Sequence, residues 1–211
     1  MSTESKLREK MALHGHSLFE RGYGCGSSGN ISARIDDGFL ITPTNSCMGR
    51  LDPARIAKLD HNGNHLSGDP PSKEAFLHLA MYGERTRETS IVHLHSTYSV
   101  AVSCLAGLNT DDVLPPITAY YVMRVGRLPL VPYYAPGDGQ LAEAVRKLAS
   151  KSRAMLLANH GPVIAGKNLD GAVYAAEELE ETAKLYLLLN GRDTSFLTAE
   201  HVRDLHARFP S

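Results

Sequence analysis

The chain carries two histidines, His93 and His95, at a spacing that suits metal binding. They lie in residues 90–97, SIVHLHST, an apolar run that predicts a strand. Residues i and i+2 of a strand point to the same face, so both imidazoles would project together, close enough for one metal ion to bridge them. The pair alone is weak support, because one histidine capping a backbone carbonyl and one solvated histidine would explain it equally well. The hypothesis needs a third ligand.

His160 is the candidate for that third ligand. It lies in residues 155–166, MLLANHGPVIAG, whose pattern predicts two strands about a tight turn at His160-Gly161-Pro162. Gly161 has no side chain and would let a neighbouring element approach closely. Three neutral imidazoles with an open fourth position are typical of catalytic zinc sites, whereas structural zinc sites are usually closed by four protein ligands.

Glu74 is a candidate acid or base next to such a site. Ser72 reads as the N-cap of a helix predicted from residue 72 to about residue 87, with Glu74 in its first turn. Free N–H groups and the helix dipole favour a carboxylate there, so capping alone would explain Glu74. Alternatively Glu74 faces the metal, because the same helix start offers Ser72, Lys73 and backbone donors to an anionic substrate. The spacing leaves both interpretations open.

A glycine-rich loop, residues 22–32 (GYGCGSSGNIS), contains a G-x-G-x-x-G pattern. Dinucleotide binding by such a loop needs a strand before it and a helix after it. Here the order is reversed: apolar residues between 7 and 18 recur with helical spacing, and residues 31–35 alternate as in a strand. We therefore disfavour a dinucleotide. Exposed backbone N–H groups followed by Asn30 and Ser32 suit a single phosphate or carboxylate better.

The remaining pattern intermixes strands and helices, which predicts an α/β layered architecture. With 211 residues, 43% of them hydrophobic, the chain is expected to form one domain over residues 1–211. The other expected strands are 39–42, paired with 31–35 in a hairpin, and 128–134; the other expected helices are 139–150 and 169–190, the last ended by Gly191.

Composition excludes several classes of protein. A net charge of −1 gives no basic footprint for nucleic acid or an acidic membrane. The N-terminal MSTESKLREK is polar, and no apolar run approaches the roughly 20 residues that span a bilayer, so we expect a cytoplasmic protein without membrane association. Three widely spaced cysteines indicate neither a disulfide framework nor a thiolate zinc site.

Five short motifs, GSSGNIS, LITPTN, PSKE, VHLH and NHG, occur in this order along nearly the whole chain. Together they resemble the class II aldolase/adducin family. The resemblance implies a three-layer α/β/α fold around a central, largely antiparallel sheet, and a homotetramer with active sites at subunit interfaces. It also implies one zinc ion per subunit, held by His93, His95 and His160, with Glu74 as the acid/base carboxylate. Another divalent metal is an alternative, because imidazole accepts several.

The resemblance further implies a phosphate site, made by Asn30, Thr44, Asn45, Ser72 and Lys73. Two departures from the aldolases fall there. The aldolases have Thr-Gly and Ser-Ser-Glu where this chain has Thr44-Asn45 and Ser72-Lys73-Glu74. The ammonium of Lys73 would either reinforce phosphate binding or attract a second negative charge on the substrate.

The PSKE form and residues 119–126, AYYVMRVG, look most like the branch of the family that decarboxylates 3-oxo-tetronate 4-phosphates. This likeness implies release of CO2 and dihydroxyacetone phosphate through an enediolate. Tyr121 is then a second candidate proton donor, with Tyr120 one residue away as the alternative and a buried structural role also open. Two other functions are alternatives. One is an aldolase of the fuculose 1-phosphate type, and the other is a non-catalytic module like the adducin head, which would be expected to lose metal ligands.

Overall fold

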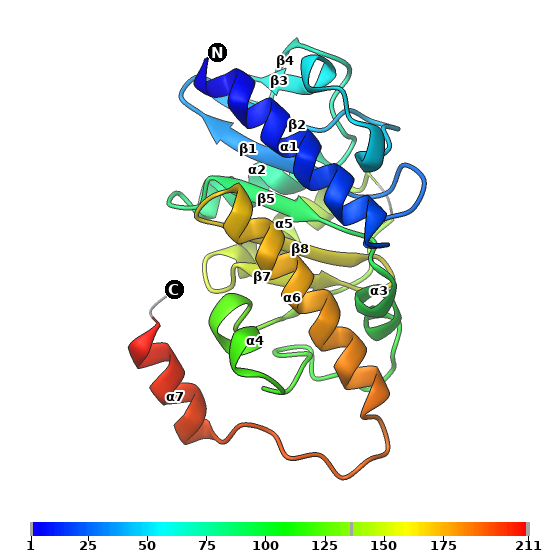
Figure 1. Ribbon diagram of the computed structural model, residues 1–211, viewed down its shortest axis with the longest axis vertical. Coiled ribbons are helices and arrows are strands. Elements are labelled where there is room, and N and C mark those ends of the chain that lie inside the picture. The colour runs from blue at the N-terminus through cyan, green and yellow to red at the C-terminus, as the bar shows by residue number, and fades with distance from the viewer. Residues whose placement is uncertain (1, 136, 210–211) are drawn as a thin grey trace.

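The computed structural model describes residues 2–135 and 137–209, and its centre is one sheet of eight strands (Figure 1). Their spatial order is β4-β3-β2-β1-β5-β8-β7-β6. All neighbouring pairs are antiparallel except β6 and β7. The strands are β1 (Asn30–Ile35), β2 (Gly38–Ile41), β3 (Ala57–Leu59), β4 (His65–Ser67), β5 (Ser90–His93), β6 (Leu130–Val131), β7 (Ala154–Leu157) and β8 (Gly161–Gly166).

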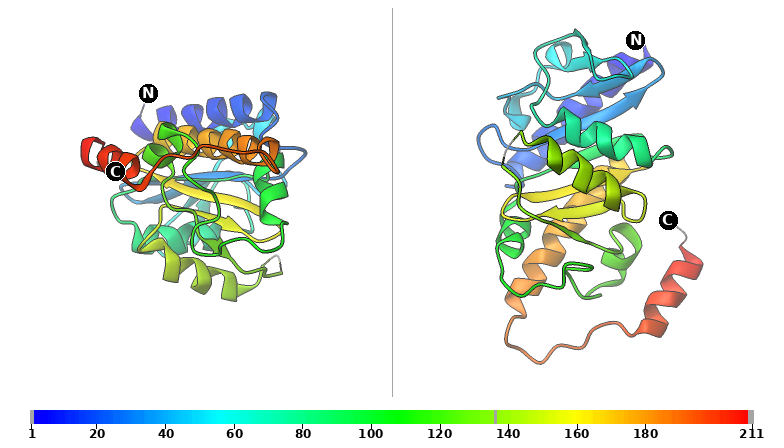
Figure 2. Two further views of the ribbon diagram at one scale, coloured as in Figure 1. Left: turned by 90° about the horizontal axis from the view of Figure 1, so that it is seen from below. Right: turned by 180° about the vertical axis from the view of Figure 1, so that it is seen from behind.

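Helices cover both faces of the sheet, which gives three layers (Figure 2). One face packs against α1 (Thr3–Glu20), α3 (Thr97–Ser103), α4 (Ala119–Arg124) and α6 (Leu169–Leu188), and the other against α2 (Ala75–Glu84) and α5 (Gly139–Ala149). The helix α7 (Ala199–Arg208) follows an extended segment at the C-terminal end, and two 3-10 turns (Met48–Arg50 and Pro53–Arg55) follow β2. The expected α/β/α class with a largely antiparallel sheet is confirmed. No helix among residues 2–135 and 137–209 is long and apolar enough to cross a membrane.

Alternation along the central strands decides which side chains reach the site. In β1, Ile31 and Ala33 join the core beneath α1 and α6, so Asn30 and Ser32 point to the α2 side. In β5, Ile91 belongs to the core beneath α2 and α5, and His93 shares its face. Asn30 lies opposite His93 in the pairing of the two strands, so the polar site forms at one end of the α2 face.

The predicted elements are present, but several are shorter than expected. The hairpin of β1 and β2 and the hairpin of β7 and β8 are confirmed. The strand expected over 128–134 is reduced to β6 at the sheet edge, where Pro129 and Pro132 cannot donate to a ladder. The helix expected from residue 72 begins at Ala75, and Ser72 is not its N-cap. The last predicted helix ends at Leu188, with Leu189 rather than Gly191 as its C-cap.

Candidate metal centre and active site

Glu74, His93, His95 and His160 converge, with their candidate ligand atoms all within 4.8 Å of one another. The Nε2 atom of His95 lies 3.0 Å from Nε2 of His93 and 3.1 Å from Nε2 of His160. The two carboxylate oxygens of Glu74 approach the other imidazoles, at 3.5 Å from His93 Nε2 and 3.2 Å from His160 Nε2. Four residues separated by up to 86 positions therefore share one centre.

The three histidines meet as predicted, but they are not all placed by the predicted secondary structure. His93 is the last residue of β5, and the strand ends there instead of reaching Thr97. His95 follows in a loop, so strand alternation is not the reason that the two imidazoles meet. His160 lies in the turn between β7 and β8. The close approach expected at Gly161 is confirmed, because a Cβ atom there would lie 2.2 Å from the Leu94 carbonyl oxygen.

A buried carboxylate holds the loop that contains His95. Glu180 of α6 accepts hydrogen bonds from the hydroxyls of Ser96 and Ser99 and from the backbone N–H groups of Tyr98 and Ser99. These contacts cap the start of α3, directly after His95. Glu180 therefore fixes the segment between β5 and α3 from the opposite side of the sheet.

The protonation of the histidines suits metal binding. His93 Nδ1 lies 2.8 Å from the carbonyl oxygen of Pro162 and must donate to it, which leaves a lone pair on Nε2. Burial lowers the pKa of His93, and it lowers the pKa of His95 to about 4. Both imidazoles are therefore neutral near pH 7, which is the form that binds metals.

The carboxyl group of Glu74 is ionised. Burial raises its pKa, but the hydrogen bond with His160, the nearby His93 and the amide of Asn30 outweigh burial and hold the pKa well below its usual range. Its side chain makes no capping hydrogen bond to α2, so the interpretation of Glu74 as a helix cap alone is not supported.

The donor set fits a divalent ion such as zinc. Imidazole nitrogens and carboxylate oxygens are both zinc ligands, and three imidazoles with an open fourth position are one of the catalytic zinc sets. Zn–N bonds of about 2.0–2.1 Å in a tetrahedral site imply ligand atoms about 3.3 Å apart, close to the separations found here.

A chain of hydrogen bonds extends from Glu74 into the protein. The Asn30 amide donates to Glu74 Oε2 at 2.7 Å, and the Asn30 amide oxygen lies 2.5 Å from His78 Nε2. Ser32 Oγ lies 2.6 Å from His78 Nδ1 and 2.9 Å from the Tyr82 hydroxyl. Because Asn30 turns its amide nitrogen to the carboxylate, its oxygen must accept; His78 then donates from Nε2, Ser32 donates to Nδ1, and Tyr82 donates to Ser32. The buried imidazole of His78 thus fixes the amide that holds Glu74.

We expect His78→Phe to lower kcat by about 10- to 100-fold, the range typical of partners that orient site residues, because Asn30 would lose the donor that fixes its amide. Steady-state kinetics and metal content measure this effect. Tyr82→Phe removes only the far hydroxyl and serves as the control, with an expected change of less than about threefold. If His78→Phe and Tyr82→Phe lowered kcat by the same factor and the melting temperature by the same amount, His78 would have only a structural role.

Sequence reasoning missed His78 and Glu180. Glu74 and His78 are four residues apart in PSKEAFLH, a spacing that places two side chains on the same side of a helix start, and this signal was available. No local pattern marks Glu180, because its partners are more than 80 residues away.

Two of the expected phosphate-binding residues line a cavity of about 350 Å³. Thr44 and Asn45 meet the glycine loop there, at Gly26 and Ser27. The loop runs from α1 to β1, so the expected order of helix before strand is confirmed. A compact backbone turn at Asn45, with φ of 54°, exposes its side chain.

The other three expected phosphate-binding residues, Ser72, Lys73 and Asn30, do not line this cavity. Ser72 lies beside this segment, because its N–H donates to the carbonyl of Thr42, and its hydroxyl accepts from the N–H of Glu74. Lys73 is exposed. Asn30 is buried, and its amide is already engaged by Glu74 and His78, away from the cavity.

The two tyrosines of α4, Tyr120 and Tyr121, differ in their exposure to solvent. Tyr121 is buried in the core beneath α1 and α6, and among the described residues its hydroxyl has no hydrogen-bond partner. Burial raises its pKa. Tyr120 is 57% exposed, near the guanidinium of Arg124. A second cavity of about 570 Å³ opens beside His95 and His160 and is lined by two further tyrosines that the sequence analysis did not single out, Tyr133 and Tyr134.

Comparison with known proteins agrees with the fold and the motifs. The family model described as Class II Aldolase and Adducin N-terminal domain matches residues 9–187. The chain belongs to the class II aldolase and adducin family. The chain is 52% identical over 206 residues to the 3-oxo-tetronate 4-phosphate decarboxylase of Pectobacterium atrosepticum. The match covers 97% of this chain and 94% of that protein. It is 34% identical over 189 residues to the L-fuculose phosphate aldolase of Haemophilus influenzae, covering 87% and 84%.

The fold of this class II aldolase family member is also close to a solved structure. The crystal structure of YgbL from Escherichia coli superposes with a TM-score of 0.95 at 49% identity, covering 97% of this chain and 99% of that one.

Proposed function

We propose that the protein is a metal-dependent carboxy-lyase that converts a 3-oxo-tetronate 4-phosphate to dihydroxyacetone phosphate and CO2. The observation that carries the proposal is the convergence of Glu74 with three histidines in a chain half identical, over nearly its whole length, to proteins named as this decarboxylase. We assign His93, His95 and His160 as ligands of one zinc ion per subunit. We also propose a homotetramer with active sites at subunit interfaces.

The chemistry of the substrate explains why an aldolase-like site suits it. Its carboxylate is β to a ketone, so the C–C bond electrons pass toward the ketone as CO2 departs, and an enediolate remains. A divalent ion, when bound, supplies Lewis-acid stabilisation of that negative charge, worth several kcal/mol. Aldol cleavage of a ketose 1-phosphate yields the same enediolate.

We assign Glu74 to deliver the proton that completes the reaction. Protonation of the carbon that carried the carboxylate converts the enediolate to dihydroxyacetone phosphate. The contacts with Asn30 and His160 hold Glu74 ionised, so it has to take up a proton from water within the substrate complex before it donates that proton to the carbon. Asn30 and His78 keep its carboxylate in place during the transfer.

The phosphate of the substrate is assigned to the cavity lined by Thr44 and Asn45. Ser72 is joined to the neighbouring Thr42 by a backbone hydrogen bond, and the exposed Lys73 follows it in the chain. Guided by its position, we place Asn30 with Glu74 rather than with the phosphate, although the family resemblance implies a phosphate contact.

Lys73→Ala is expected to raise KM by about tenfold, because an ammonium that contacts an anion contributes about 1.5 kcal/mol or more to binding. Initial-rate kinetics over a range of substrate concentrations measure it. Lys6→Ala, also exposed, is the matched control. An unchanged KM in Lys73→Ala would make Lys73 a solvated residue at a helix start.

Tyr120 is better placed than Tyr121 to reach a neighbouring subunit, because only Tyr120 is exposed. If it donates a proton across the interface, Tyr120→Phe is expected to lower kcat by about 10²-fold or more, with the oligomer retained. Tyr121→Phe should leave kcat within about threefold. Kinetics together with sedimentation separate these cases, and the reverse order would return the role to Tyr121.

A fuculose 1-phosphate aldolase is the nearest alternative, favoured by the 34% identity to the Haemophilus enzyme. Incubation with each substrate in parallel, followed by enzymatic assay of dihydroxyacetone phosphate, separates the two. We expect kcat/KM to be at least about 10³-fold higher for the 3-oxo-tetronate 4-phosphate. A preference for fuculose 1-phosphate would overturn the proposal. A non-catalytic adducin-like module is disfavoured, because all three histidines and Glu74 are retained.

A further inference from the structure

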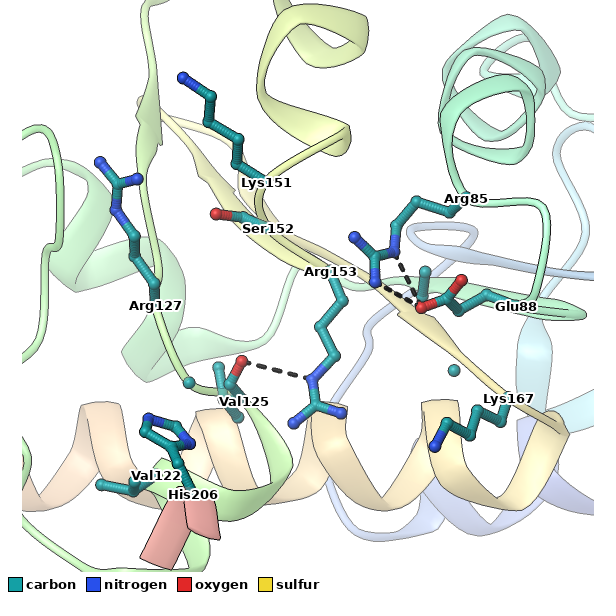
Figure 3. Close-up of a pocket in the computed structure, with 13 residues that line it drawn as sticks. Arg85, Glu88, Val122, Val125, Arg127, Lys151, Ser152, Arg153, Lys167 and His206 are labelled. Atoms are coloured by element: carbon teal, nitrogen blue, oxygen red, sulfur yellow. Dashed lines mark hydrogen bonds and ion pairs between the residues drawn. The ribbon is translucent and has the colours of Figure 1, made fainter. Parts of the chain in front are cut away.

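A further polar cavity, of about 230 Å³, is lined by residues from several elements around the end of β8 (Figure 3). It lies at the opposite end of the central strands from the histidines. In β8 the metal-site end is next to His160, whereas Gly166 and Lys167 at the other end line this cavity. A strand of this length separates the two sites by about 20 Å. The cavity is therefore distinct from the site of the proposed reaction.

The cavity collects positive charge from five separate parts of the fold. Its basic side chains come from the end of α2, the loop after α4, the segment before β7, the end of β8 and helix α7: Arg85, Arg127, Lys151, Arg153, Lys167 and His206. Among the residues that the structure describes, its one acidic lining residue is Glu88. Even with His206 neutral, the lining contains five cations and one carboxylate, and Lys151 and Arg127 extend away from Arg153 (Figure 3).

The available carboxylates leave most of this charge uncompensated. Glu88 accepts from the Arg85 guanidinium, with the shortest contact at 2.5 Å. Arg127 pairs with Asp111 at 3.3 Å, outside the cavity. Among residues 2–135 and 137–209, no carboxylate forms an ion pair with Lys151, Arg153 or Lys167.

The guanidinium of Arg153 is held in a fixed position in the lining of the cavity. Its guanidinium is only partly exposed and donates to the carbonyl oxygens of Met123 and Val125 at the end of α4, at 2.5 and 3.5 Å. Burial and the adjacent Arg85 lower its pKa, which reflects an unfavourable charge that the protein nonetheless retains. The carbonyl contacts explain where Arg153 points, but they give no reason for four further cations in the lining of the same cavity.

We propose that this cavity binds a phosphate group, as inorganic phosphate or as the head of a small phosphate ester. A dianion would offset the excess charge, and guanidinium and ammonium groups are the side chains that best bind its oxygens. The volume of about 230 Å³ has room for one such group. Because His206 comes from α7, the bound anion would also hold α7 against the end of the sheet.

Isothermal titration of the full chain with inorganic phosphate tests the proposal. The double variant Lys151→Gln/Lys167→Gln changes two exposed residues that take no part in the proposed reaction. The native protein should bind phosphate at two sites per chain, the assigned substrate phosphate site and this cavity. In the double variant we expect the affinity of the cavity to fall by at least about tenfold, because one charge-assisted hydrogen bond contributes a factor of about ten or more to affinity. The control Lys6→Gln/Lys147→Gln makes the same change of charge on exposed residues outside the cavity and should retain both sites.

Two further measurements locate the bound anion and its source. Phosphate should slow hydrogen exchange of α7 amides in the native protein and in the control, but not in Lys151→Gln/Lys167→Gln, while turnover stays the same in all three. Titration with glycerol 3-phosphate separates the sources: tighter binding than phosphate identifies an ester, and equal or weaker binding identifies the free ion.

Equal phosphate binding by the two double variants would overturn the proposal. So would an altered sedimentation of Lys151→Gln/Lys167→Gln with no second phosphate site in the native protein, because the cations would then face acidic side chains of another copy. Neither result depends on which reaction the protein catalyses.

Discussion

Replacing His93, His95 or His160 singly by Ala is expected to reduce turnover by at least about 10³-fold and to remove most of the bound metal. Each change takes one of three imidazoles from a site whose only other candidate ligand, within residues 2–135 and 137–209, is Glu74. Loss of the Lewis acid costs several kcal/mol of transition-state stabilisation, which corresponds to this factor. Metal content by plasma mass spectrometry and initial rates with saturating substrate measure both effects.

His65→Ala is the matched control, because His65 is exposed on β4 and lies outside the cluster. It should keep its metal and its rate. His95→Ala and His160→Ala are the more informative replacements, since both residues are partly exposed, whereas His93 is buried and bonded to Pro162. Full metal occupancy in all three variants would show that the site is misassigned.

Glu74→Gln is expected to lower kcat by about 10²- to 10⁴-fold while KM changes little, the loss typical of removing a general acid. The amide keeps the volume of Glu74 and an oxygen that can accept from Asn30, and the three histidines remain. What is lost is the transferable proton. Glu84→Gln, at the exposed end of the same helix, is the control and should leave both constants unchanged.

The fate of the product carbon separates two roles for Glu74. Decarboxylation itself needs no base, so Glu74→Gln should still release some CO2. In deuterated water its product should then acquire deuterium without stereochemical preference, whereas the native enzyme should deliver it to one face. Full activity of Glu74→Gln would assign the proton to a tyrosine or to water and leave Glu74 as a site carboxylate only.

Local sequence patterns predicted that His93 and His95 share a site, but tertiary contacts explain why the two side chains lie close together. The spacing of His93 and His95 indicated a shared site, but the strand stops at His93, and the loop to α3 carries His95 back to the centre. That loop depends on Glu180, which comes from α6 far along the chain, so no window of sequence around His95 contains the cause. Gly161 was predictable because only a residue without a side chain tolerates the carbonyl of Leu94 so close.

Tertiary contacts also place neighbouring residues in different surroundings. Asn30 follows the glycine loop, and its position opposite His93 turns its amide to Glu74, whereas its predicted contact with a phosphate remains a prediction. The pattern of residues 119–126 could not assign one of two adjacent tyrosines, because a one-residue difference on a helix exchanges the exposed and the buried side. Folding of α4 onto α6 buries Tyr121 and leaves Tyr120 exposed.

The most direct test of the proposed function uses a 3-oxo-tetronate 4-phosphate labelled with carbon-13 in its carboxyl group. We predict that the protein loaded with zinc releases labelled CO2 and unlabelled dihydroxyacetone phosphate in equal amounts. We also predict that the protein stripped of metal by a chelator releases neither above the background rate, and that restored zinc returns both. Consumption of the substrate with the label retained in the product, or equal release by the stripped and loaded protein, would contradict a metal-dependent decarboxylation.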